Sequence, residues 1–110
     1  MGEARRFGIV IGLRDECVAA YRALHDGPGV RDLLHAANIR DFSIFLARMP
    51  DGKLYEFGRY DYVGDDYATD MANLAAHPRN IVWLQHCDPM QRPLPGAAGW
   101  MEIQEIFHNP

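Results

Sequence analysis

Residues 41–63, "DFSIFLARMPDGKLYEFGRYDYV", contain two strand-like segments separated by a short turn. Residues 41–49 and 53–63 are rich in aromatic and aliphatic side chains, a composition typical of β-strands. The Pro-Asp-Gly between them supplies residues that tight turns prefer. This stretch therefore predicts a β-hairpin in the middle of the chain.

The part of the chain before this hairpin is predicted to form a strand and a broken helix. Residues 6–13 are a short apolar run with β-branched side chains, which predicts a buried strand. Residues 15–25 follow with Asp15 as the expected N-cap. Their apolar side chains recur at helical spacing, at Cys17, Ala20, Tyr21 and Leu24. After "GPG" the helical pattern resumes over residues 30–37, and Asn38 is expected to end that helix in a left-handed conformation.

The part after the hairpin predicts two more helical pieces and a closing strand. The segment "GDDYATDMANLAA" predicts a helix that begins at Asp65 or Asp66. Its inward side chains are expected to be Tyr67, Met71 and Leu74. Residues 77–88 predict a second helix with a proline in its first turn. Residues 89–99 hold three prolines and two glycines and predict a loop, and residues 100–108 predict a strand.

The resulting order, β-α-β-β-α-β, is that of an α+β ferredoxin-like subunit. A chain of 110 residues suits a single domain, so we assign residues 1–110 to one unit. Helices on one face of the sheet leave its other face uncovered. Two subunits could cover these faces mutually, so we expect a homodimer that closes a dimeric α/β barrel.

Composition and charge exclude several classes of function. The net charge is −4, which argues against nucleic-acid binding because that depends on clustered Lys and Arg. No apolar run approaches the roughly 18 residues that cross a membrane, and no signal peptide is apparent. Cys17 and Cys87 are not spaced as the cysteines of metal-binding or redox motifs are, and the zinc-binding motif HExxH is absent. We therefore expect no metal site. We expect a soluble, cytoplasmic protein.

Tyr21 and His25 form the first candidate pair for chemistry. At a spacing of four residues they project from nearly the same side of a helix, about 40° apart. His25 falls just beyond the edge of the apolar stripe, where a side chain can reach a cleft. Spacing alone leaves two interpretations open: the pair belongs to an active site, or Tyr21 packs while His25 caps the helix end.

Glu105 is the second candidate, as an acid–base group. By strand alternation it shares a face with three apolar residues, Met101, Ile103 and Phe107. A carboxylate in such surroundings needs a partner or a raised pKa. The alternatives are an edge glutamate that reaches water and a structural ion pair with Arg59.

The aromatic side chains suggest a ligand class. Several of them could line a pocket together with a few polar groups, which suits a small polar ligand such as a sugar. For each aromatic residue taken alone, packing in the core is the simpler interpretation.

The sequence resembles the L-rhamnose mutarotase family over nearly its whole length. The resemblance is carried by "YRALH" in the first helix, "IRDFSIFL" at the second strand, "VWLQHCDP" in the fourth helical piece and "MEIQEIFH" at the end. None of these is a unique short motif, but their order and spacing together are specific. The family implies a dimeric α/β barrel that interconverts the α and β anomers of a 6-deoxy-hexose without a cofactor.

The resemblance also assigns roles to individual residues. The family's proton-donating histidine falls on His25, and a substrate-contacting tyrosine falls on Tyr21. A second sugar-contacting tyrosine falls on Phe42, which lacks the hydroxyl, and a tryptophan pair falls on Val82 and Trp83. These departures concern the pocket, so they affect the identity of the sugar more than the reaction. We expect L-rhamnose, with L-fucose as the next alternative.

Two other functions remain open at this point. The same fold could carry another cofactor-free enzyme, such as a monooxygenase or a lactone isomerase, because fold alone does not determine function. It could also be a ligand-binding protein without catalytic activity.

Overall fold

The computed structural model describes residues 4–110. Its strands are β1 (Arg5–Leu13), β2 (Ile39–Arg48), β3 (Leu54–Tyr62), β4 (Gln91–Arg92) and β5 (Met101–Ile103). Its helices are α1 (Val18–Asp26), α2 (Arg31–Ala36), α3 (Tyr67–Ala76) and α4 (Pro78–Cys87). Short 3₁₀ turns, η1 (Asp15–Cys17) and η2 (Asp88–Met90), precede α1 and follow α4. The predicted α+β, ferredoxin-like order is confirmed.

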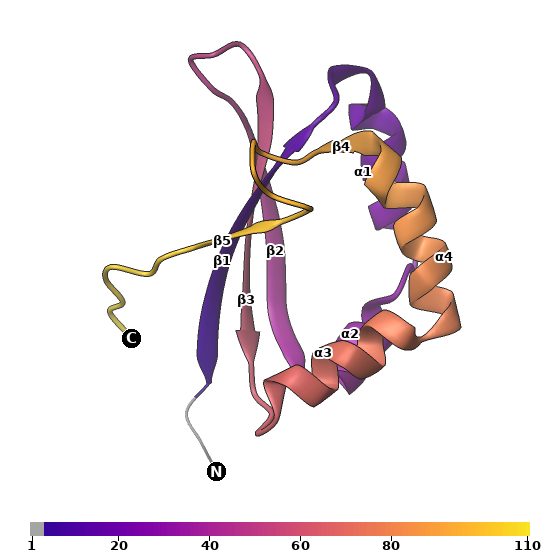
Figure 1. The fold of residues 1–110 in the computed structure, drawn as a ribbon, viewed down its shortest axis with the longest axis vertical. Helices are drawn as coiled ribbons and strands as arrows, with labels where there is room; N and C mark the ends of the chain where they lie inside the picture. The colour runs from indigo at the N-terminus through magenta and orange to yellow at the C-terminus, as the bar shows by residue number, and fades with distance from the viewer. Residues whose placement is uncertain (1–3) are drawn as a thin grey trace.

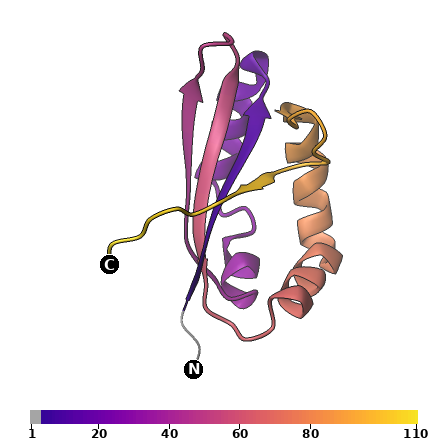
Figure 2. The same ribbon diagram turned by 60° about the vertical axis from the view of Figure 1, so that its left-hand side comes forward.

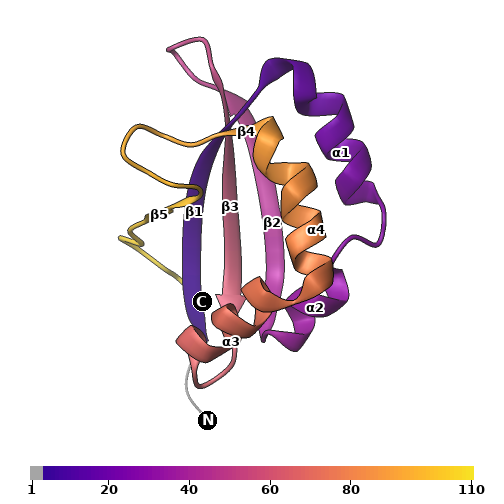
Figure 3. The same cartoon turned by 45° about the vertical axis from the view of Figure 1, so that its right-hand side comes forward.

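All strand pairs of the sheet are antiparallel. β3 lies between β2 and β1, and β1 pairs on its other edge with β4 and with β5. The predicted hairpin is therefore confirmed as the pair β2–β3. Figures 1 and 3 show the helices arranged along one face of the curled sheet, and Figure 3 shows β5 beside β1.

A register shift in β2 determines which of its side chains face the helices. The shift lies between Arg40 and Ser43, and Asp41 within it has a φ of 54°. Ile39 packs in the core before the shift, whereas Phe42 and Ile44 line the inner cavity after it. Since strand side chains alternate between faces, the extra residue is what turns Phe42 toward the helices.

Two clusters of buried side chains hold the helices on the sheet. The first packs α2 and α3 against the sheet, and Phe7 stacks there on Tyr60 and Tyr67 with ring centroids 4.9 and 4.8 Å apart. As predicted, Met71 and Leu74 also pack against this cluster. The second joins α1, α4 and β1 through Leu13, Tyr21 and Cys87, with Trp83 against it. A cavity lined by members of both clusters lies between helices and sheet.

Several predicted local features are confirmed. Asn38 adopts a left-handed φ of 66° just after α2. Asp66 is the N-cap of α3, and its carboxylate accepts hydrogen bonds from the Thr69 main-chain N–H and hydroxyl. Pro78 occupies the first turn of α4.

Three predictions of local structure were wrong. Asp15 caps no helix, because the chain enters α1 through η1 and the N-cap position falls on Cys17. The predicted loop contains the two-residue strand β4, which pairs with β1. The closing strand stops at Ile103, because β1 pairs with it only over Gly8–Val10, opposite Ile103 to Met101.

Removing the N-cap of α3 is expected to lower stability. Asp66→Ala leaves the Thr69 main-chain N–H without its side-chain acceptor, so the free energy of unfolding should fall by about 1 kcal/mol. Urea denaturation measures this value. The neighbouring exposed residue provides the control, since Asp65→Ala should cost less. Equal losses in the two variants would contradict the capping role.

Candidate active site

The cavity between helices and sheet has a volume of about 860 Å³ and lies within the size range of small-molecule sites. β1, β2 and β3 form one wall, and side chains from all four helices form the other. Figure 3 shows these helices standing over the inner face of the sheet. The wall is largely apolar, with the polar groups of Tyr21, His25, Glu56 and Gln91 among the lining side chains.

His25 lies in the last turn of α1, half-buried at the cavity wall. Its Nδ1 lies 2.8 Å from the main-chain oxygen of Tyr21, and because a carbonyl only accepts, Nδ1–H is the donor. This hydrogen bond leaves Nε2 as the ring atom that can gain or lose a proton. Within residues 4–110, Nε2 makes no hydrogen bond. The helix end thus fixes the ring through one nitrogen and leaves the other available for chemistry.

Aromatic rings hold the imidazole on two sides. The Tyr21 ring lies 4.3 Å from it between centroids, and the Trp83 ring meets it edge-on at 5.0 Å. The "GPG" segment allows Trp83 to come this close to α1. Gly29 has a φ of +51°, and a Cβ there would lie 3.0 Å from the Trp83 ring. A side chain at Gly29 would therefore displace the indole that supports His25.

The hydroxyl of Tyr21 is buried and hydrogen-bonded. Gln91 Nε2 on β4 donates to it at 2.9 Å, and both residues are less than 8 % exposed. Burial, and then the charge of Glu56, raise the pKa of this hydroxyl far above its ordinary value. Tyr21 therefore stays a neutral phenol. Since its oxygen accepts from Gln91, its own proton remains available for donation.

Glu56 is a functional candidate that the sequence analysis missed. It lies on β3 with only 1 % of its surface exposed, and it lines the cavity. Neither carboxylate oxygen has a hydrogen-bond partner within residues 4–110. Burial raises its pKa to about 7, while the nearby Tyr21 hydroxyl opposes the rise. Strand alternation could have found it, because it lies two residues from buried Leu54 and four from buried Tyr60.

Comparisons with known proteins agree with this architecture. A sequence profile of the L-rhamnose mutarotase family matches residues 6–109. The chain belongs to the L-rhamnose mutarotase family. It is therefore an enzyme of the isomerase class. A crystallised L-rhamnose mutarotase from Formosa agariphila has a similar fold, with a TM-score of 0.72 and 19% sequence identity over 96% of this chain and 99% of that one. No curated protein sequence matches significantly.

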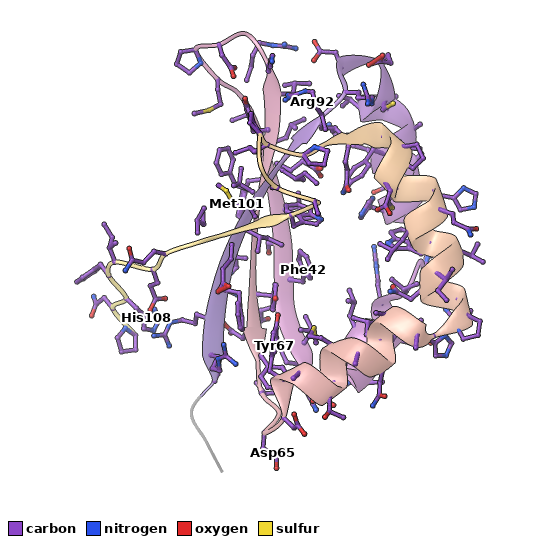
Figure 4. The ribbon with its side chains drawn as sticks, viewed as in Figure 1. Phe42, Asp65, Tyr67, Arg92, Met101 and His108 are labelled. Atoms are coloured by element: carbon purple, nitrogen blue, oxygen red, sulfur yellow. The ribbon has the colours of Figure 1, made fainter. Side chains whose placement is uncertain are left out.

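Four of the residues singled out from the family resemblance surround the cavity. Tyr21, His25, Phe42 and Trp83 all line it. Figure 4 shows Phe42 on β2, pointing toward the space between sheet and helices, and its ring lies 5.2 Å from that of Tyr60. Val82 is not part of this wall. Its side chain is 52% exposed and borders a shallow hollow on the outside of α4.

Glu105 also lies away from the cavity of this mutarotase-family chain. It follows β5, where Arg6 donates two hydrogen bonds to its carboxylate at 2.8 and 3.0 Å. These hydrogen bonds lower the pKa of Glu105. Arg59, considered as an alternative partner, instead pairs with Asp61 at 2.7 Å. The alternative of an Arg59–Glu105 ion pair is therefore not what the structure shows: the ion pair of Glu105 is with Arg6, and the structure does not bring Glu105 together with His25.

The described residues also bear on metal sites and membrane spans. No group of three or more His, Cys, Asp or Glu side chains in residues 4–110 could hold a metal ion. None of the helices in that range is long and apolar enough to cross a membrane.

Replacing Glu56 by Gln is expected to change how stability depends on pH. Its pKa is about 7 in the folded protein and 4.5 ordinarily, so between these values the folded state holds a proton that the unfolded chain has released. The resulting contribution to wild-type stability is complete below the lower value and is lost as the pH rises through the higher one. The glutamine of the Glu56→Gln variant does not titrate, so its stability does not fall with pH for this reason.

Urea denaturation at about pH 5 and about pH 8 tests this expectation. The free energy of unfolding of Glu56→Gln, relative to wild type, should rise between the two conditions. The exposed residue Glu16 provides a control, and Glu16→Gln should show no such rise. A Glu56→Gln difference that is constant with pH would contradict the buried, proton-holding carboxyl group.

Proposed function

We propose that this protein is a sugar mutarotase that interconverts the α and β anomers of a 6-deoxy-hexose. L-Rhamnose is the first candidate substrate and L-fucose the second. The observation that carries the proposal is the geometry of His25. Its Nδ1 is fixed to the Tyr21 main chain, and its ring lies at the wall of a cavity large enough for a monosaccharide.

Mutarotation requires proton transfers at two oxygens of the sugar. The ring oxygen O5 must gain a proton as the C1–O5 bond breaks, and the C1 hydroxyl must lose one as the aldehyde forms. Rotation about C1–C2 followed by the reverse transfers gives the other anomer. Imidazole gains and loses protons near neutral pH, so His25 Nε2 can supply the proton to O5 and recover it on closure.

The rest of the cavity suits a deoxy-sugar. The face of a pyranose carries C–H groups that can pack on the Trp83 ring, and the Tyr21 hydroxyl can bind a sugar hydroxyl. Phe42 offers an apolar surface in place of a hydroxyl. Deoxy-sugars of this class carry a methyl group at C6 in place of a hydroxymethyl group. A methyl group gives up no hydrogen bond when it packs against such a surface.

His25→Ala is expected to lower the rate of anomer exchange about 10²–10⁴-fold, because it removes the proton donor. Saturation-transfer NMR of the anomeric protons of L-rhamnose and L-fucose measures this rate. The matched control is His86→Ala, which removes an exposed imidazole of α4 and should leave the rate unchanged.

Two results would refute the proposal. One is a wild-type protein that accelerates exchange of neither sugar, and tight binding of a sugar without any rate effect would then support a non-catalytic binding protein. The other is a His25→Ala variant that keeps the full rate.

We further propose that the enzyme is a homodimer joined through the sheet face that the described helices leave open. Figure 2 shows that face on the side opposite the helices. Cross-strand pairs align Met101, Val10, Phe57 and Phe45 in one row across it. Phe45 is 62% exposed, so a second copy would bury a large apolar side chain.

The segment after β5 supports the proposal that a second copy of the chain covers this open sheet face. It leads away from the sheet on the side opposite the helices, where Figure 4 labels His108. Ile106 and Phe107 on it are 91% and 79% exposed. Apolar side chains on an extended chain end are suited to packing on a symmetry-related partner.

Phe45→Asp is expected to convert the dimer to a monomer, because it would place a charge in the apolar interface. Light scattering coupled to size-exclusion chromatography measures the mass in solution. Ile81→Asp, at a residue of α4 that is 44% exposed, is the control and should remain dimeric. A wild-type monomer, or a Phe45→Asp dimer, would contradict this interface.

A further inference from the structure

The position of Glu56 in the sheet is unsuited to a carboxylate unless a ligand is present. Its cross-strand neighbours are Ile11 on β1 and Leu46 on β2, both apolar. The residue is 1% exposed, and both oxygens are without hydrogen-bond partners in the described part of the chain. An unpaired buried carboxylate is costly, and an aliphatic residue would pack here without that cost. The position therefore favours a ligand that brings hydrogen-bond donors.

Tyr21 connects Glu56 to the proposed proton donor. The face of its ring meets the His25 imidazole at 4.3 Å between centroids. Its hydroxyl, at the other end of the side chain, lies near enough to Glu56 for each group to perturb the pKa of the other. All three residues line the same cavity. A pyranose lying along Tyr21 would therefore meet the imidazole and the carboxylate together.

We propose that Glu56 is the second acid–base group of the mutarotase reaction, the one that exchanges a proton with the C1 hydroxyl of the sugar. The inference rests on the function proposed above and identifies the partner that His25 requires. It assigns this role to Glu56 in place of Glu105, which Arg6 holds outside the cavity.

The proton transfers balance between the two groups. The His25 imidazolium gives its Nε2 proton to O5 while the C1–O5 bond breaks, and the Glu56 carboxylate takes the proton from the C1 hydroxyl as the C1–O1 double bond forms. After rotation about C1–C2, O5 attacks C1 and returns its proton to Nε2, and Glu56 returns its proton to O1. The enzyme ends in its starting state, and no oxidant, reductant or cofactor is consumed.

The environment of Glu56 suits proton exchange at neutral pH. Burial raises its pKa to about 7, so the ionised and protonated forms are close in free energy there. The proposed transfers start from a proton on His25 and an ionised Glu56, so the reaction cannot run in either direction when both groups are protonated or both are deprotonated. The wild-type rate should therefore show a bell-shaped dependence on pH.

Glu56→Gln tests the assignment, because it preserves the shape of the side chain but cannot accept a proton. The expected result is a fall in kcat of about 10²–10⁴-fold with little change in KM, measured on L-rhamnose by saturation-transfer NMR. One limb of the bell-shaped pH profile should also disappear. Glu56→Asp keeps a carboxyl group and should restore part of the rate, with both limbs present.

Control variants distinguish a catalytic effect of Glu56 from a loss of folding and from a failure of the proposed function. Glu16→Gln, at an exposed position, should keep the wild-type rate and profile. Thermal unfolding and circular dichroism establish that each variant is folded at the assay pH. If Glu56→Gln is folded but slower with both limbs of the profile unchanged, Glu56 is structural and the inference is overturned.

A second pattern would also overturn it while leaving the proposed function intact. This is an active wild type, an inactive His25→Ala variant and a Glu56→Gln variant with the full rate. A wild type without activity on any 6-deoxy-hexose would instead refute the proposed function itself.

Discussion

The arrangement of the site depends on the way Tyr21 is held between helix and sheet. Its main-chain oxygen accepts the hydrogen bond that orients His25, and its buried hydroxyl accepts one from Gln91 at the far edge of β1. These two hydrogen bonds join the end of α1 to the short strand β4, elements that are far apart in sequence. Because one bond is accepted by the main chain of Tyr21 and the other by its side-chain hydroxyl, a displacement of α1 would disturb the imidazole and the cavity wall together.

The same cavity combines apolar packing with a small number of polar groups. Rings from both core clusters form part of its largely apolar wall, so the sugar would displace water from apolar surface as it binds. The few polar groups then act in surroundings of low polarity, where hydrogen bonds are stronger and unpaired charges are costly. Glu56 illustrates the cost, since its carboxyl group has no hydrogen-bond partner within residues 4–110 at a position where a hydrocarbon side chain would pack well. Sites of catalysis are where such local conflicts are expected.

The sequence predicted those parts of the fold that depend on local patterns. The hairpin, the left-handed Asn38 and the Asp66 cap follow from turn, strand and capping preferences, and each is confirmed. The closing strand was predicted too long, because the pattern of alternation continues past Ile103 while the pairing with β1 does not. The bulge near Asp41 was not predicted, although it turns Phe42 inward, because its position depends on how two strands pair.

The candidate site was predictable only where helix spacing or family resemblance applied. Tyr21 and His25 share one helix, so their proximity follows from a spacing of four residues. Glu56 and Gln91 approach them from strands distant in sequence, and no local sequence pattern predicts such a contact. Strand alternation singled out Glu105 and Glu56 was not considered, because the sequence does not show which carboxylate has an arginine beside it. In the structure Arg6 neutralises Glu105, and Glu56 has no such partner among the described residues.

The most direct test of this account is a crystal structure of the protein soaked with L-rhamnose. We predict a pyranose in the cavity, with its ring oxygen about 3 Å from His25 Nε2 and its C1 hydroxyl directed at Glu56. A sugar bound elsewhere, or an imidazole turned away from the ring oxygen of a sugar inside the cavity, would contradict it.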